Sequence, residues 1–236
     1  MESIICIPGY WKNEQELPED IRQSSDGYYV YEGSVLRHSK DAERHFELEF
    51  CGRDDRMYDA FRVAGLANGI MPESLSMIER HASVVYIKGA GGSMENAEAL
   101  AQAAAAVLKA GGMGLKVETA GMAFTLDQWM GLLAIEPQTS LYRMYVIDSI
   151  MEQDGTVFSC GMHNLGLRDT IVSGEAFQEA VDLIKTFSYY QIVDKPAILD
   201  GETFSGFRIS EEANPPYKDE GLFSNPFGVW RLSRIS

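Results

Sequence analysis

SVVYIKGAGGSMENAEALAQAAAAVLKAGGMGLKVE, residues 83–118, is the stretch that decides the fold. Its β-branched opening, glycine cluster, alanine-rich middle and closing Leu-Lys-Val-Glu predict a strand, a turn, a helix over residues 93–110 and a second strand at 115–118. A strand, a helix and a strand in this order form a crossover, which is typical of nucleotide-binding sheets and also of sheets without a ligand. The stretch therefore predicts the local topology and leaves the function open.

The helix predicted over residues 93–110 has two apolar faces of different size. Its larger face carries Leu100, Val107 and Leu108. The other side consists of small residues: Ala99, Ala103, Ala105 and Ala106. Small side chains allow another element to approach the helix closely. We therefore expect a sheet beneath this helix and a second helix, or a partner subunit, above it.

The rest of the chain alternates between strand and helix patterns. Strands are predicted at residues 4–7, 28–37, 44–50, 141–151, 156–160, 197–199, 204–209 and 229–235. Further helices are predicted at residues 54–63 and 174–187 and after Thr125. These elements predict an α+β fold with a mixed, largely antiparallel sheet covered by helices. We expect residues 1–236 to form a single compact unit, with possible halves at 1–81 and 82–236 that each run strand, helix, strand, strand, helix.

The charge balance narrows the classes of partner. The chain has 35 acidic and 20 basic side chains, which give a formal charge of -15. Such a surface repels phosphate backbones and anionic lipids, so neither nucleic acid nor a membrane is expected as a partner. The acidity favours solubility and is also compatible with a basic protein partner or with a homo-oligomer.

Cysteine usage and the first residues bear on the compartment. Cys6, Cys51 and Cys160 lie far apart and show no Cys-x-x-Cys spacing, which suits a reducing compartment. The opening residues lack a basic leader and a long apolar run. These features predict a cytoplasmic protein.

The glycine loop of the crossover is the first candidate binding site. Backbone N–H groups at Gly89, Gly91, Gly92 and Ser93 could approach a phosphate at the start of the helix. Two features oppose a dinucleotide site. Met94 occupies the third glycine position, and Glu95 adds a negative charge where the phosphate would lie. No Gly-Lys-Ser or Gly-Lys-Thr follows the loop. The alternative is a structural turn that the Ser93 hydroxyl caps.

The second candidate is the stretch Ser-Cys-Gly-Met-His-Asn-Leu-Gly at residues 159–166. Cys160 as nucleophile, His163 as base and Asn164 as the orienting group supply the residue types of a thiol enzyme, and Asp169 or Glu118 could supply a carboxylate. A spacing of three residues along an extended strand, however, places the thiol and the imidazole on opposite faces. The alternative is that His163 fastens a turn by hydrogen bonds. We expect no metal ion and no cofactor, because the four histidines are scattered at spacings that no metal site uses.

Three segments carry a resemblance to a known family. They are residues 117–129 with Gly121 and Trp129, the Gly-Met-His-Asn-Leu-Gly of residues 161–166, and the Phe-Ser-Asn-Pro-Phe-Gly-Val-Trp-Arg of residues 223–231. With the Ile-Pro-Gly-Tyr-Trp opening, the chain resembles a family of bacterial proteins described only as a domain of unknown function. The resemblance implies a bacterial, cytoplasmic, single-chain protein and carries no activity, cofactor or catalytic residue.

Three functions follow from these observations. We expect first a non-catalytic binding or protein-interaction module with a cleft bordered by the C-terminal loops. The alternatives are a small-molecule enzyme that uses Cys160 and His163, and a nucleotide-binding protein whose site runs from Gly89 to Ser93.

Overall fold

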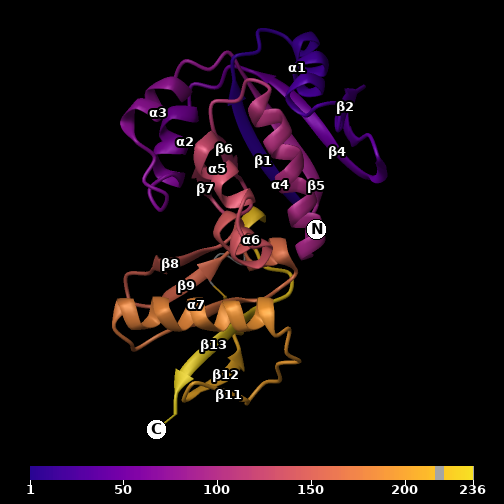
Figure 1. The fold of residues 1–236 in the computed structure, drawn as a ribbon. Helices are drawn as coiled ribbons and strands as arrows, with labels where there is room; N and C mark the ends of the chain where they lie inside the picture. Colours follow the sequence, from indigo (N-terminus) through magenta and orange to yellow (C-terminus); the bar gives the residue numbers. More distant parts are fainter. Residues whose placement is uncertain (216–220, 236) are drawn as a thin grey trace.

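The computed structural model describes residues 1–215 and 221–235. They form two β-sheets with helices packed on them, one sheet built from the N-terminal part of the chain and the other from the C-terminal part (Figure 1). Both sheets are largely antiparallel, and the predicted α+β fold is confirmed.

The first sheet has seven strands in the order β2-β3-β4-β5-β1-β6-β7. Its members are β1 (Glu2–Gly9), β2 (Tyr29–Glu32), β3 (Val35–His38), β4 (Asp41–Gly52), β5 (Ser83–Ala90), β6 (Leu115–Val117) and β7 (Met122–Phe124). β5 pairs with β1 along its whole length and with β4 from Ser83 to Lys88. The predicted boundary between the halves, at residues 81 and 82, therefore lies within one sheet, because it separates β5 from its partners β1 and β4.

The predicted crossover is present, and a third strand, β1, lies between the two strands that it connects. β5 and β6 are each antiparallel to β1, which lies between them, so they are parallel to each other. Helix α4 (Met94–Lys109) connects them and crosses one face of the sheet. It begins where the sequence predicts, because the Ser93 hydroxyl accepts a hydrogen bond from Asn96 N at 3.1 Å and so caps the helix.

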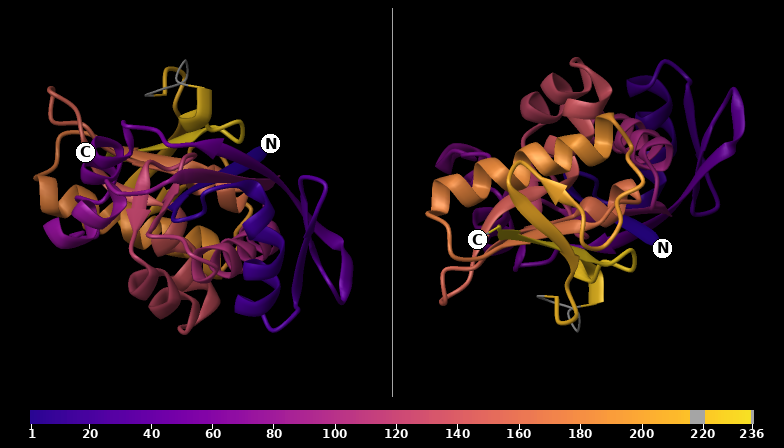
Figure 2. Two further views of the ribbon diagram at one scale, coloured as in Figure 1. Left: turned by 90° about the horizontal axis from the view of Figure 1, so that it is seen from above. Right: turned by 90° about the horizontal axis from the view of Figure 1, so that it is seen from below.

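The second sheet has six strands in the order β11-β12-β13-β10-β9-β8. They are β8 (Ile147–Met151), β9 (Val157–Cys160), β10 (Asp169–Val172), β11 (Thr203–Phe204), β12 (Phe207–Glu211) and β13 (Val229–Arg234). β10 and β13 are parallel, and the other neighbours are antiparallel. Helix α7 (Phe177–Val193) lies across one face of this sheet, as Figure 2 shows from below.

The two faces of the first sheet are covered by different helices. On one face, Ile5, Ile7 and Ile87 pack against α4 and against α1 (Leu17–Ser24), α5 (Leu126–Leu133) and α6 (Pro137–Tyr145). On the other face, Cys6 and Val84 pack against α2 (Met57–Ala64) and α3 (Pro72–Ile78). Alternate residues of β1 therefore enter two separate cores, as the period of a strand requires.

Helix α4 is buried on almost every side, as its alanines predict. Side chains from four other segments donate hydrogen bonds to carbonyl oxygens of α4 and of the residue after it. The pairs are Tyr145 Oη to Ala97 O at 2.9 Å, Trp129 Nε1 to Ala101 O at 3.1 Å, Ser24 Oγ to Ala106 O at 2.9 Å and Trp11 Nε1 to Ala110 O at 2.9 Å. Large rings reach the helix backbone because no bulky side chain stands between them. The expectation of a second element above the helix is confirmed, and α1, α5 and α6 supply it.

Two stretches differ from their predicted structure. Residues 141–145 were expected to be strand but form the last turns of α6, which begins at Pro137 and is capped by the Glu136 carboxylate on Gln138 N and Thr139 N. Their aromatic residues are buried against α4 and α7, and this packing overrides strand propensity. Residues 197–199 form no strand. Helix α3 and strand β10 were not predicted.

We expect alanine at Gly161 to destabilise the protein far more than alanine at Gly174. Both glycines have positive φ, +114° and +83°, so both variants incur about 1 to 2 kcal/mol of left-handed strain. A Cβ atom at Gly161 would also overlap the carbonyl oxygen of Tyr145, whereas one at Gly174 meets open space. Overpacking adds about 1 to 3 kcal/mol at Gly161. Urea unfolding measures the difference, and equal losses in the two variants would contradict it.

Candidate functional site

The motif at residues 161–166 forms the junction between the two sheets. Met162 to Leu165 make a short 3-10 helix, η2, between Gly161 and Gly166, which both have left-handed backbone conformations. A Cβ atom at Gly166 would overlap the carbonyl oxygen of Gly92. The motif therefore packs directly on the glycine loop that precedes α4, although about seventy residues separate them in the sequence.

Asn164 is the centre of the hydrogen bonds at this junction. It is fully buried, and its Oδ1 accepts from the hydroxyls of Ser3 and Thr119, each at 2.7 Å. Its Nδ2 donates to Gly161 O at 3.0 Å, and its own carbonyl oxygen accepts from Gly92 N at 3.1 Å. These contacts tie η2 to β1, to the end of β6 and to the glycine loop. They also occupy the side chain, so it orients no catalytic base.

Asp169 supports the same motif from the second sheet. Its carboxylate is buried and accepts from Ser159 Oγ at 3.1 Å, Met162 N at 3.2 Å and Asn225 Nδ2 at 2.7 Å. Burial raises the pKa of Asp169 to about 6, and these donors oppose part of the rise. The carboxylate holds the turn and the C-terminal loop together.

His163 and Cys160 are both buried but do not form a pair. The imidazole is 1% exposed, and neither ring nitrogen has a hydrogen-bond partner among the described residues. The backbones of Leu222 and Thr119 lie near the ring without completing a hydrogen bond. Burial lowers the pKa of His163 to about 4. A neutral imidazole that makes no hydrogen bond to the thiol does not activate it.

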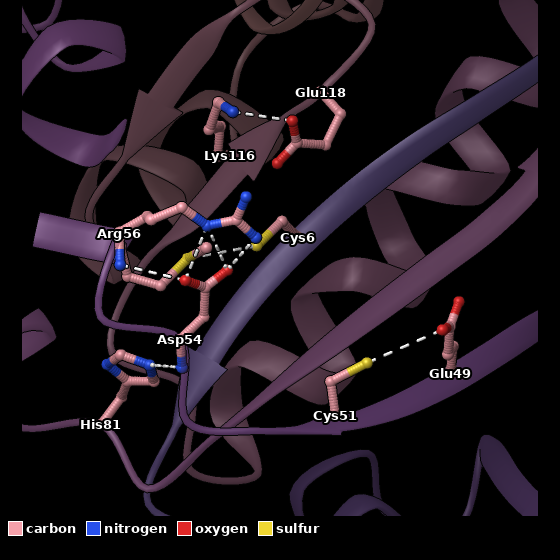
Figure 3. Close-up of polar contacts among 9 residues, drawn as sticks. Cys6, Glu49, Cys51, Asp54, Arg56, His81, Lys116 and Glu118 are labelled. Carbon is pink, nitrogen blue, oxygen red and sulfur yellow. Dashed lines mark hydrogen bonds and ion pairs between the residues drawn. The ribbon is translucent and has the colours of Figure 1, made fainter. Parts of the chain in front are cut away.

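Glu118 lies in a cleft of about 490 Å³ that is formed by the first sheet and α2. Figure 3 shows its carboxylate facing the Lys116 ammonium, at 2.7 Å. Three cations line this cleft, and each pairs with a carboxylate. The other two pairs are Arg56 with Asp54 at 2.7 Å and Lys88 with Glu49 at 2.7 Å. Each cation among the described residues that line this cleft is paired with a carboxylate, and neither Cys160 nor His163 is one of these lining residues.

The buried thiol of Cys6 lies next to Met57, one of the residues that line this cleft. The Cys6 Sγ lies 3.8 Å from Met57 Sδ, and burial, followed by the Glu118 charge, raises the pKa of Cys6. Arg56 lowers the pKa of Asp54 to about 2. Cys6 is therefore a packed thiol and Asp54 a paired carboxylate, and neither is prepared for proton transfer.

A well-defined cavity lies where the two sheets meet, and we call it the inter-sheet cleft. Its volume is about 760 Å³. Its walls come from the start of α4, the segment after η2, the end of α7 with the loop that follows, and the C-terminal strand with its preceding loop. The lining residues are Gly92, Ser93, Met94, Glu95, Leu165, Gly166, Leu167, Arg168, Gln191, Ile192, Lys195, Pro196, Ile198, Phe227 and Trp230.

Two of the four predicted ligand-binding residues line the inter-sheet cleft. Gly92 and Ser93 are at its edge. Gly89 instead faces Phe46 and Leu100, and Gly91 faces Ser3, so both are positions of close internal packing. Ser93 serves as the cap of α4, which was the alternative role considered for it.

Arg168 is the best-defined charged group of the inter-sheet cleft. Its guanidinium lies 4.1 Å from the centre of the Trp230 ring, and its Nη1 donates to Glu211 Oε1 at 2.7 Å. Its backbone oxygen accepts from Gln191 Nε2 at 3.2 Å, which fixes the strand end to α7. Stacking on Trp230 and the ion pair with Glu211 orient the side chain, so it presents a cation at a defined place on the wall.

Sequence reasoning missed Arg168, Lys195, Phe227 and Trp230 as members of one site. They come together because β10 pairs in parallel with β13, with Thr170 opposite Trp230, and no local pattern announces that pairing. The one available signal was the Asn-Pro-Phe-Gly turn at residues 225–228, which belongs to the C-terminal loops expected to border a cleft.

Other classes of site find little support in the described parts of the chain. Within residues 1–215 and 221–235, no three His, Cys, Asp or Glu side chains are grouped so that they could hold a metal ion. Over the same ranges, no helix combines the length and the apolar character needed to cross a bilayer. Comparison with protein family models, with curated proteins and with solved structures found no match to this chain.

His163 and Asp169 are both buried and titratable, and they affect the pH dependence of the folding stability in opposite directions. His163 has a folded pKa of about 4, below the ordinary 6.5, so its contribution is lost as pH falls below 6.5. Asp169 has a folded pKa of about 6, above the ordinary 3.8, so its cost is relieved as pH falls below 6. Over the window from pH 6 to 4 the two effects oppose each other.

We expect His163→Leu to become more stable relative to the natural chain as pH falls. The gain between pH 7 and pH 5 is about 2 kcal/mol, because leucine removes the group that must stay uncharged. Urea unfolding at both pH values measures it. Asp169→Asn is the matched control, since it removes the compensating group and makes stability more sensitive to acid. A pH-independent difference between His163→Leu and the natural chain would contradict the assignment.

We expect iodoacetamide to modify the folded protein slowly, at Cys51 alone. Cys51 is partly exposed, and burial and Glu49 raise its pKa, whereas Cys6 and Cys160 are buried. Peptide mass analysis after timed labelling identifies the modified residue, and Cys51→Ser should abolish the native reaction. Fast labelling of Cys160 near pH 6 that His163→Leu removes would instead support a thiol enzyme.

Proposed function

We propose that the protein is a non-catalytic binding protein that holds a small molecule in the inter-sheet cleft. The observation that carries this proposal is the cavity of about 760 Å³ with apolar walls and a stacked arginine, at the meeting point of the two sheets. Ligand pockets in proteins have this size and mixture of apolar and few polar groups. The cleft is also framed by backbone that the Asn164 hydrogen bonds fix in place.

Binding is favoured over catalysis by how the reactive side chains are used. Asn164 and Asp169 are occupied by structural hydrogen bonds, and neither ring nitrogen of His163 has a hydrogen-bond partner among the described residues. General acid-base or nucleophilic chemistry needs such groups within hydrogen-bond reach of one another. Among the described residues, those that line the inter-sheet cleft include no cysteine, histidine or aspartate.

Nucleotide binding remains the alternative for the same cleft, because Gly92 and Ser93 lie at its edge. The Glu95 carboxylate, which also lines the cleft, opposes a phosphate there. A basic protein partner or a second copy of the chain is a separate prediction from the acidic composition. The bacterial and cytoplasmic setting that the resemblance implies also stays a prediction.

A cleft-filling variant tests the proposal. Ile198 lines the inter-sheet cleft, whereas its neighbour Leu199 is 64% exposed. Ile198→Trp should fill the cleft, and Leu199→Trp is a matched control with the same added ring. Thermal unfolding is measured with a panel of nucleotides, amino acids and organic acids at millimolar concentration. We expect at least one class to raise the Tm of the natural chain and of Leu199→Trp, because a ligand that binds only the folded state stabilises it.

The same ligand should leave the Tm of Ile198→Trp unchanged. Stabilisation of all three proteins alike would contradict the assignment of the cleft, and the absence of any stabilising class would contradict the binding function. A response limited to nucleotides would support the alternative.

A further inference from the structure

We infer that the inter-sheet cleft takes an organic monoanion, a molecule with a flat apolar body and one carboxylate or similar acidic group. The inference rests on the proposed function and specifies its ligand class. Two features of the cleft support this ligand class: the apolar side chains of its walls and the balance of its charged side chains.

The walls select an apolar body. More than half of the lining residues are apolar, and they come from every segment that borders the cleft. They are Met94, Leu165, Leu167, Ile192, Pro196, Ile198, Phe227 and Trp230. Phe227 and Trp230 contribute aromatic rings, which favour flat molecules through stacking and large contact areas. A strongly hydrated ligand would leave these surfaces without partners.

The charged residues select a negative group. Among the described residues that line the cleft, Arg168 and Lys195 are cations and Glu95 is an anion, which gives these side chains a formal balance of +1. The chain as a whole carries a formal charge of -15. The positively charged lining therefore attracts an anion into the cleft, although the net charge of the chain is negative.

The same balance limits the ligand to one negative charge. Arg168 already shares its charge with Glu211, which leaves the exposed Lys195 as the less compensated cation. Glu95 would repel a second acidic group. A nucleotide with several phosphate charges would leave most of them unpaired inside the cleft. One carboxylate on an apolar body matches both the walls and the charges.

A pair of fluorescent probes separates the apolar requirement from the charged one. The probe 8-anilinonaphthalene-1-sulfonate has a flat apolar body with one negative charge, and N-phenyl-1-naphthylamine has the same rings without the sulfonate. Each is titrated against the full chain, and binding is followed by fluorescence. We expect one saturable site for both probes and a Kd about five- to tenfold lower for the sulfonate.

Variants that remove a positive or a negative charge from the cleft should change sulfonate binding in opposite directions. Lys195→Gln should weaken sulfonate binding about fivefold and leave the neutral probe unchanged. Glu95→Gln should strengthen sulfonate binding by a similar factor, because it removes a repelling charge. Lys109→Gln at the far end of α4 is the matched control with the same loss of charge, and it should change neither probe. Ile198→Trp should abolish binding of both.

The outcomes distinguish the inference from the proposed function. Equal affinity for both probes, with both lost in Ile198→Trp, would overturn the monoanion inference and leave the binding cleft in place. The same conclusion follows if Lys195→Gln and Lys109→Gln weaken the sulfonate equally. Failure of either probe to saturate, or undiminished binding to Ile198→Trp, would overturn both proposals.

Discussion

The structure depends on how closely other elements approach the backbone of α4. A helix normally uses its carbonyl oxygens for its own hydrogen bonds, and bulky side chains keep neighbours several ångströms away. Here the alanines leave the backbone accessible, and the rings of Trp11, Trp129 and Tyr145 reach its carbonyl oxygens while their faces fill the surrounding core. Each of these polar atoms is thereby satisfied in a buried place. A larger residue on the alanine side would displace a ring and leave its donor without a partner, so packing and hydrogen bonding here require the same small residues.

The position of α4 in turn fixes the junction between the sheets. Its N-terminus follows the glycine loop, and Gly92 both donates to Asn164 O and lies against Gly166. The loop therefore has no room to move without disturbing η2. Asn164 links η2 to the first sheet through hydrogen bonds with Ser3 and Thr119. Asp169, in the second sheet, accepts a hydrogen bond from Asn225 of the C-terminal loop. The inter-sheet cleft opens beside this fixed backbone, and its shape is consequently set before a ligand arrives, which lowers the ordering cost of binding.

The sequence was most informative where a local pattern is strong. The Ser93 cap, the alanine helix and the crossover were predicted because each rests on neighbouring residues. Residues 141–145 were predicted wrongly, because buried aromatic residues in a short run fit a strand as well as a helix, and only their packing against α4 decides between them. The cleft could be predicted only at Gly92 and Ser93. Its cation and rings arrive through the parallel pairing of β10 with β13, a long-range contact that leaves no local trace.

The motif at residues 161–166 shows why residue types alone do not identify chemistry. A thiol, an imidazole and an amide within five residues match the composition of a catalytic set, yet each functional group here has a different environment. The side-chain amide of Asn164 makes three hydrogen bonds and its backbone carbonyl accepts a fourth, and burial lowers the pKa of the His163 ring to about 4. A base must exchange a proton with a group it touches, whereas this imidazole is enclosed and uncharged at neutral pH. The motif acts by shaping backbone, and it helps to frame the cleft lined by Arg168 and Trp230, where we propose that a ligand binds.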